Sequence, residues 1–149
     1  MISQTAEYAL RATVLLGSRA GRPCPTAQLA EEIDAPPSYL AKVLSDLSRA
    51  GIVDSQRGPH GGHTLARDPA ELTILDVITA VGAMIRIPDC PLGRPRHTSG
   101  LCPLHRRLDD VMAAAEQALE LATIGELIEE PNLLCSLPCI AEPSAELEP

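Results

Sequence analysis

Residues 36–67 constrain the fold of this chain more than any other stretch, because their order predicts a helix with a defined start and stop. Pro37 suits the first turn of a helix, where a missing N–H loses no partner, and Gly51 suits the left-handed position just past a helix end. Between them, apolar side chains recur at the i, i+3, i+4, i+7 spacing of one helical face: Leu40, Val43, Leu44 and Leu47. The stretch therefore begins with an amphipathic helix that packs one face against a core.

The other face of this helix is polar and weakly cationic, and a hairpin follows it. That face offers hydroxyls and two cations beside one carboxylate: Ser38, Tyr39, Lys42, Ser45, Arg49 and Asp46. Residues 52–55 and 63–66 can then pair across residues 57–62, whose Arg-Gly-Pro-His-Gly-Gly sequence favours sharp turns. A cationic helix followed by a hairpin with arginine at its tip is typical of a winged helix-turn-helix, so the stretch predicts contact with duplex DNA.

The charge balance qualifies that interpretation. The chain has 149 residues and a net charge of −8, which by itself disfavours a polyanionic partner. Residues 1–67 contain seven Lys/Arg and six Asp/Glu, for +1, whereas residues 68–149 contain five and fourteen, for −9. The acid thus lies in the half that need not touch phosphate. We expect modest non-specific affinity, with phosphate contacts made partly by backbone N–H groups and helix N-termini.

Helix start signals elsewhere in the chain predict a mainly α protein with a small β-hairpin wing. Ser3 and Thr26 are placed to cap two helices ahead of the winged stretch. Two capping-box pairs predict further helix starts: Thr73 with Asp76, and Thr123 with Glu126.

A longer helix is predicted from Pro103, and its apolar stripe is long enough to pack against a second copy of the chain. The stripe comprises Leu104, Leu108, Val111, Met112, Ala115, Leu119 and Ala122. The chain therefore divides into four parts: a winged helix-turn-helix domain (1–82), a cysteine-containing sensor loop (83–102), a dimerisation helix region (103–130) and a disordered tail (131–149).

No apolar run is long enough to cross a membrane. Glu7 and Arg11 interrupt the first 16 residues, which argues against a signal peptide. We therefore expect no membrane partner and a cytoplasmic location.

Four segments together carry a family resemblance: SQTAEYALRA near the start, SYLAKVLSDLSRAGIV, the RGPHGGHTLAR wing, and CPLH before the long helix. They resemble the Rrf family of bacterial winged helix-turn-helix transcriptional regulators, of the IscR and NsrR kind, over about residues 1–130. The resemblance implies a homodimer on double-stranded DNA, with recognition helices in successive major grooves and wing tips in the adjacent minor grooves. The sequence departs from the family pattern at His63, where an aromatic residue or tyrosine is usual.

The resemblance also implies which residues contact DNA: Ser38, Tyr39 and Lys42 on the recognition helix, and Arg57, Gly61 and Gly62 on the wing, with His60 beside them. Their chemistry agrees. Lys42 can approach guanine or a phosphate, and the hydroxyls at the helix N-terminus can hold phosphate. Arg57 can enter a minor groove, and the paired glycines let the backbone come close to the sugar-phosphate edge. The alternative is a helix that merely displays a solvated polar face.

Five cysteines, an odd number, favour reduced thiols or metal ligands over a disulfide framework. In relatives that bind an iron–sulfur cluster, the loop before the long helix usually presents three cysteines, plus a variable fourth ligand. Here two remain, and the candidate ligands are Cys90, Cys102, His97 or His105, and Glu7 from the partner chain. A Cys/His mixture favours a 2Fe–2S cluster, although zinc accepts the same ligands.

Other interpretations of these residues stay open. Cys90 and Cys102 could form a reversible disulfide or be inert thiols, His105 could be an ordinary helix residue, and Glu7 could be a surface glutamate. Cys135 and Cys139 could add ligands or a redox pair, although Pro138 between them argues against a regular helix. Cys24, between two prolines, suggests no function.

The sequence thus predicts a homodimeric, sequence-specific transcriptional regulator, a repressor, whose DNA affinity depends on an iron–sulfur cluster or on thiol redox state in the Cys90–Cys102 loop. The alternative is a metal- or redox-carrying protein that uses the winged-helix scaffold for protein contacts. No nucleophile–base pair, phosphate-cradling loop or supported carboxylate pair is apparent, so an enzyme is not expected.

Overall fold

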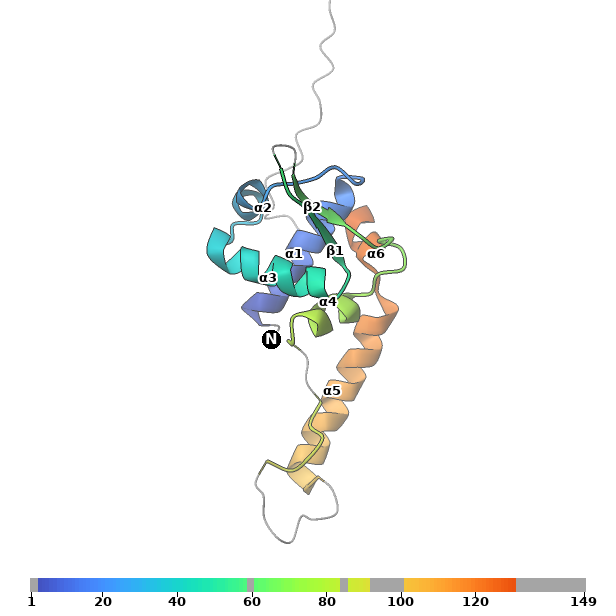
Figure 1. Cartoon of the computed structure of the whole chain (residues 1–149). Coiled ribbons are helices and arrows are strands. Elements are labelled where there is room, and N and C mark those ends of the chain that lie inside the picture. Colours follow the sequence, from blue (N-terminus) through green and yellow to red (C-terminus); the bar gives the residue numbers. More distant parts are fainter. Residues whose placement is uncertain (1–2, 59–60, 84–85, 92–100, 131–149) are drawn as a thin grey trace, which may run out of the picture.

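The computed structural model describes residues 3–58, 61–83, 86–91 and 101–130. Within these residues the chain is mainly helical with one two-stranded antiparallel hairpin, as predicted (Figure 1). The elements are α1 (Gln4–Ser18), α2 (Thr26–Glu32), α3 (Pro37–Arg49), β1 (Val53–Gln56), β2 (Gly62–Leu65), α4 (Ile74–Ala80), α5 (Pro103–Leu121) and α6 (Ile124–Glu129). None of the described helices has the length and apolarity that a bilayer span requires.

The core is aliphatic and is built around α1, which packs against α3, α4, α6 and β2. Ser3 caps α1 as predicted, because its hydroxyl accepts a hydrogen bond from the Ala6 N–H. The largest side chains with almost no exposed surface come from every part of the body: Leu16, Leu29, Ile33, Leu40, Leu44, Leu47, Ile52, Leu72, Val77 and Ile124. Burial of these side chains fixes how α2, α3 and the hairpin sit relative to one another.

Helix α3 has the predicted start, stop and buried face. It begins at Pro37 and ends before Gly51, whose φ of 71° is the left-handed conformation that glycine adopts without strain. The four apolar residues at the predicted spacing are all buried: Leu40, Val43, Leu44 and Leu47.

The hairpin has the predicted register, with strand limits one residue removed from those expected. Val53 pairs with Leu65 and Ser55 with His63, and Gly62, expected in the loop, is already the first residue of β2. Cys24 adds a backbone bridge to His63, in which N–H and C=O groups are exchanged at 2.9 and 2.8 Å. The chain before α2 therefore pairs with the wing.

The prediction that Thr26 caps α2 is wrong. Pro25 occupies the N-cap position without a side-chain hydrogen bond, and Thr26 is the first helical residue. Its hydroxyl lies 2.9 Å from Nε2 of His63 instead. A tertiary contact to the wing has replaced the local cap that the sequence pattern favoured.

Helix α5 extends away from the body, on the opposite side from strands β1 and β2 (Figure 1). Both predicted capping boxes are present, Thr73 with Asp76 at α4 and Thr123 with Glu126 at α6. Ala122, predicted on the α5 stripe, lies just past the helix in extended conformation. Helix α6 then returns to the body, where Ile124 is fully buried and its N–H bonds the Leu72 carbonyl at 2.8 Å. The predicted tail at 131–149 lies outside the described residues.

Candidate DNA interface and metal-ligand group

The outer face of α3 presents the polar residues that the sequence placed there. Ser38, Tyr39 and Lys42 are exposed. Tyr39 is held from α1, since its hydroxyl shares a hydrogen bond with Thr5 and its ring meets the edge of Tyr8 at a centroid distance of 5.8 Å and an angle of 70°. The orientation of Tyr39 on the outer face is therefore fixed by a helix that forms the core.

Acidic side chains neutralise some cations of residues 1–67 and leave others without a partner, so the net charge of this half does not describe its proposed DNA-binding face. Four of its arginines are engaged in intramolecular ion pairs: Arg11 with Glu7, Arg19 with Glu32, Arg49 with Asp46, and Arg67 with Asp76. Within the part of the chain that the structure describes, Arg22 has no acidic partner, and neither do the two cations of α3 and the wing, Lys42 and Arg57. These two cations remain available to an external anion such as DNA phosphate.

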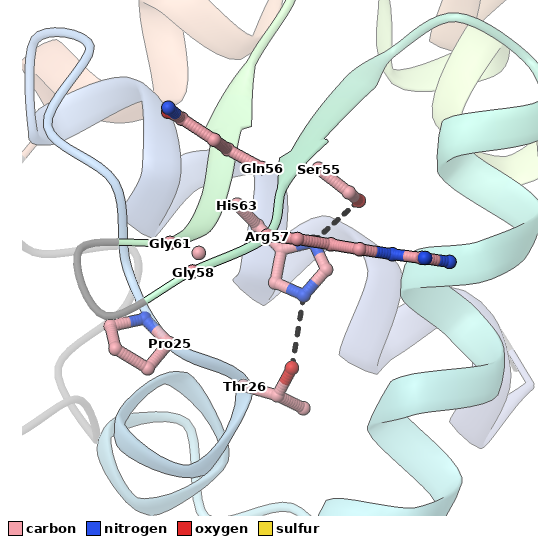
Figure 2. Close-up of a pocket in the computed structure, with 9 residues that line it drawn as sticks. Pro25, Thr26, Ser55, Gln56, Arg57, Gly58, Gly61 and His63 are labelled. Atoms are coloured by element: carbon pink, nitrogen blue, oxygen red, sulfur yellow. Dashed lines mark hydrogen bonds between the residues drawn. The ribbon is translucent and has the colours of Figure 1, made fainter.

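His63 fastens the hairpin to the start of α2, as Figure 2 shows. Its Nδ1 lies 2.9 Å from the Ser55 hydroxyl on β1, and its Nε2 lies 2.9 Å from the Thr26 hydroxyl. Burial lowers the pKa of the imidazole, which favours its neutral form. An open cavity of about 480 Å³ lies beside it, lined mainly by the turn and Pro25. His63, where the family usually has an aromatic residue or tyrosine, therefore links β1 and the start of α2 through hydrogen bonds to Ser55 and Thr26.

Stability should fall as the pH drops below about 6.5, the ordinary pKa of histidine. The unfolded chain then protonates His63, whereas the folded chain resists protonation because the ring is partly buried. Urea unfolding at pH 7.5 and 5.5 measures this loss, and a His63→Gln variant should show a smaller one. An equal loss in the variant would assign the pH dependence to other groups.

The two glycines of the wing have intramolecular functions that the sequence did not reveal. A Cβ on Gly62 would lie 2.7 Å from the carbonyl carbon and oxygen of Cys24, and one on Gly61 would lie 2.3 Å from the Gln56 carbonyl oxygen. Glycine at 62 allows β2 to approach the Cys24 backbone, and glycine at 61 allows the turn to close.

Replacing Gly62 by alanine should lower the free energy of unfolding by about 2 kcal/mol, because the added methyl meets backbone that has no rotamer to change. Thr64→Ala, two residues further on the same face of β2, is the matched control and should cost less than half as much. Urea unfolding of both variants measures the difference. Equal stability of the Gly62→Ala variant and the parent would contradict the close approach of β2 and Cys24.

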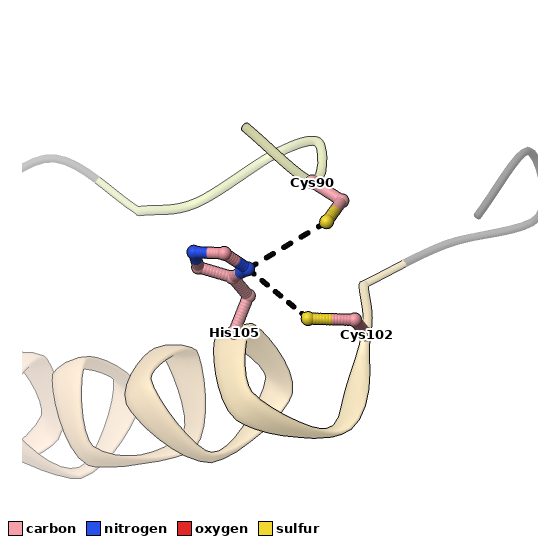
Figure 3. Close-up of side chains that lie close together, drawn as sticks. All are labelled: Cys90, Cys102 and His105. Carbon is pink, nitrogen blue, oxygen red and sulfur yellow. Dashed lines mark hydrogen bonds between the residues drawn. The ribbon is translucent and has the colours of Figure 1, made fainter. Parts of the chain in front are cut away.

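Three of the predicted ligands come together at the far end of α5: Cys90, Cys102 and His105 (Figure 3). Their ligand atoms all lie within 4.8 Å of one another. Nδ1 of His105 is 3.1 Å from the Cys102 sulfur and 3.6 Å from the Cys90 sulfur. The sequence left His97 and His105 as alternatives, and the structure brings His105 to the cysteines.

The backbone explains this grouping. Cys102 is the N-cap residue of α5 and His105 follows three positions later, so both side chains lie on the same side of the first turn. The segment 86–91 is tied to α5 by Arg86, which forms a two-pronged ion pair with Asp109 at 2.6 and 2.7 Å and also bonds Glu116 at 3.0 Å. The Arg86 guanidinium lowers the pKa of Asp109 to about 2, so this attachment persists at neutral pH.

The remaining predicted residues are less informative. His60 and His97 lie outside the described residues, as do Cys135 and Cys139. Glu7 is exposed on α1 and ion-paired with Arg11 of the same helix. Cys24 is fully buried, which raises the pKa of its thiol, so it is placed as a packing residue.

The donor set does not by itself fit a 2Fe–2S cluster. Such a cluster takes two ligands on each iron, so four are needed and they must be spread over both metals. The described residues supply three donors, close enough together to serve one ion. Soft and borderline ligands of this kind suit zinc or iron, and do not suit magnesium or calcium.

A mainly helical body with a hairpin wing, an exposed polar α3 and two available cations defines a winged helix-turn-helix protein. The sequence matches the Rrf2 family, described as iron-dependent transcriptional regulator, over residues 2–130. The chain belongs to this family, as the resemblance predicted, and it is a transcriptional regulator and not an enzyme.

Individual relatives agree with the family match. The HTH-type transcriptional regulator IscR of Escherichia coli is 30% identical over 135 residues, which cover 89% of this chain and 83% of that protein. CymR of B. subtilis, described as the global cysteine regulator, has the same fold with a TM-score of 0.68 at 23% identity, covering 87% of this chain and 96% of the other. The oxidized form of Staphylococcus aureus CymR gives a TM-score of 0.66 at 26% identity, with coverages of 87% and 96%.

Proposed function

We propose that this chain is a homodimeric, sequence-specific repressor that acts in the cytoplasm and reads double-stranded DNA with α3 and the hairpin. The observation that carries the proposal is the pair of available cations, Lys42 on the outer face of α3 and Arg57 at the wing turn. Both stand on elements held rigidly to the core, α3 by its buried face and the wing by Cys24 and His63. Rigid positioning favours base readout over loose attraction to phosphate.

Each predicted contact residue has a role in this proposal. Lys42 approaches a guanine edge or a phosphate in the major groove, and the hydroxyls of Ser38 and Tyr39 hold the flanking phosphate. Arg57 enters the adjacent minor groove, where negative potential is deepest over A·T-rich steps. His60 and Gly61 of the wing turn, together with Gly62 at the start of β2, are proposed to lie against the sugar-phosphate edge.

The dimer is proposed to form through α5. Leu104, Leu108 and Val111 are 62%, 47% and 68% exposed, and they follow one another along one side of the helix. In the described residues no side chain of α5 is fully buried. A helix of 19 residues with this exposed stripe is stabilised by pairing with the same helix of a second chain.

We further propose that Cys90, Cys102 and His105 form the regulatory site. Arg86 already ties the 86–91 segment to α5, so binding of an iron–sulfur cluster or metal ion would add a link between Cys90 and the first turn of α5, and we propose that this link fixes the spacing of the two recognition helices. Oxidation would also link Cys90 to the start of α5, because one molecule of peroxide converts the two thiols to a disulfide and is itself reduced to two molecules of water. Coupling of either state to DNA must be reciprocal, so bound DNA changes metal affinity by the same factor.

Duplexes selected from a random-sequence pool by protein purified without oxygen test the proposal. We expect the selected sequence to bind at least roughly 10³-fold more tightly than unselected duplex at the same salt concentration. We also expect its affinity to change by about 5-fold or more when a chelator removes metal or peroxide oxidises the thiols. Equal affinities in all forms would remove the regulatory part and leave the DNA-binding part intact.

A further inference from the structure

We infer that Cys90, Cys102 and His105 bind a single tetrahedral cation of the Zn²⁺ class, with the fourth position left for an exogenous ligand, in place of an iron–sulfur cluster. This inference deepens the proposed function, since it concerns the regulatory site of the same protein. It assigns a metal, a stoichiometry and a coordination number to the three side chains.

The spacing of the donors carries the inference. With Zn–S near 2.3 Å and Zn–N near 2.0–2.1 Å, two donors on one tetrahedral ion lie roughly 3.5–3.8 Å apart. Nδ1 of His105 lies 3.6 Å from the Cys90 sulfur and 3.1 Å from the Cys102 sulfur, and no pair among the three ligand atoms exceeds 4.8 Å. The three ligand atoms could therefore bind one ion after shifts that are smaller than a zinc–ligand bond. Both sulfurs face the same ring nitrogen (Figure 3).

Two independent features prepare the site. Cys102 is the N-cap residue of α5, a helix of 19 residues, and this position sets its sulfur 3.1 Å from Nδ1 of His105 on the first turn. Cys90 is brought in by Arg86, whose attachment to Asp109 and Glu116 lies further along the same helix. The Ile87 N–H also bonds Asp109, at 3.1 Å. The loop therefore reaches α5 through an ion pair that does not need the metal.

A cluster would require a different arrangement. Its ligands must span two irons, whereas these three donors converge on one point, and the described part of the chain adds no fourth donor to the group. A three-donor site with an open position accepts water or an external thiol, which is how such a centre exchanges ligands with its surroundings.

Metal analysis of the full-length protein tests the inference. Protein purified without oxygen, stripped of metal and reloaded with Zn²⁺ should retain one ion per chain and contain no acid-labile sulfide. Titration with Co²⁺ should produce the intense d–d absorption of a tetrahedral ion together with sulfur-to-cobalt charge transfer. Zn²⁺ should then displace the colour.

Variants separate the ligands from their neighbours. His105→Ala and Cys102→Ser should each weaken Zn²⁺ binding at least tenfold, because each removes one of three protein donors. Arg106→Ala, next to His105 on the same exposed turn, should bind as the parent does. Folding is checked by circular dichroism of each variant.

Several outcomes would overturn the inference. These are labile sulfide and iron in equal amounts in the oxygen-free protein, an octahedral cobalt spectrum, or unchanged Zn²⁺ affinity in folded His105→Ala and Cys102→Ser. None of these outcomes would contradict the DNA-binding proposal, because that proposal is tested separately by duplex binding.

Discussion

Replacing Lys42 and Arg57 together by alanine is expected to weaken binding of the selected duplex by about 100-fold or more. Each cation is proposed to make one contact per protomer, so a dimer loses four contacts that are worth roughly 1–3 kcal/mol each to a base edge, and less to phosphate. The slope of log affinity against log salt concentration should also become shallower, because fewer counterions are released. Fluorescence anisotropy over a series of salt concentrations gives both quantities.

The matched control for this variant is Arg106→Ala with Arg107→Ala. It removes the same number of positive charges from exposed positions on α5, far from the wing in Figure 1. We expect less than a 5-fold effect. If the control weakened binding as much as the Lys42 and Arg57 variant, the protein would be responding to net charge, and α3 and the wing would not be its reading surface.

Replacing Leu108 and Val111 together by glutamate is expected to turn the dimer into a monomer and to abolish specific DNA binding with it. The two side chains are 47% and 68% exposed in one chain, and in the proposed dimer they lie against the same stripe of the second chain. Charges placed there must be buried without partners, which should raise the dimer dissociation constant by about 100-fold or more. Sedimentation velocity measures the change in mass.

Gln117 lies on the opposite side of α5 from that stripe and is exposed, so Gln117→Glu serves as the control. It should remain dimeric and bind the selected duplex normally. A Leu108 and Val111 variant that stayed dimeric would show that another surface joins the two chains.

Local rules predicted much of this fold from the sequence. The start and stop of α3, its buried face, both capping boxes and the register of the hairpin all follow from interactions within a few residues along the chain. Such features depend on backbone chemistry and apolar spacing, which are readable in one sequence. Recognition of the family had the same basis, since its motifs fall on these elements.

Long-range contacts were not predictable in the same way. Thr26 bonds His63, which lies 37 residues away, and so does not cap its own helix. Gly62 is required by the backbone of Cys24, and α6 returns to the core through Ile124. No local pattern encodes these contacts, because they arise only once the helices and the hairpin pack together.

The donor residues of the candidate metal site were predictable from the sequence, but their arrangement was not. Cys90, Cys102 and His105 were identified as donors from their residue types, but the choice between His97 and His105 could not be made from spacing. His105 joins the group because it follows Cys102 by one helical turn, and Cys90 joins it because Arg86 ties its segment to α5, whereas His97 lies outside the described residues. The ion pair between Arg86 and Asp109 joins residues far apart in the sequence, so no local pattern predicts it.

The most direct test of the central claim is to count the chains bound to a selected duplex. Sedimentation equilibrium or native mass spectrometry of the complex, with protein prepared without oxygen, gives that number. Two chains on each duplex, and loss of the complex in the Lys42 and Arg57 variant, are the predicted result. A single chain on each duplex, or no binding to any duplex at low ionic strength in the metal-loaded, metal-free and oxidised forms, would contradict it.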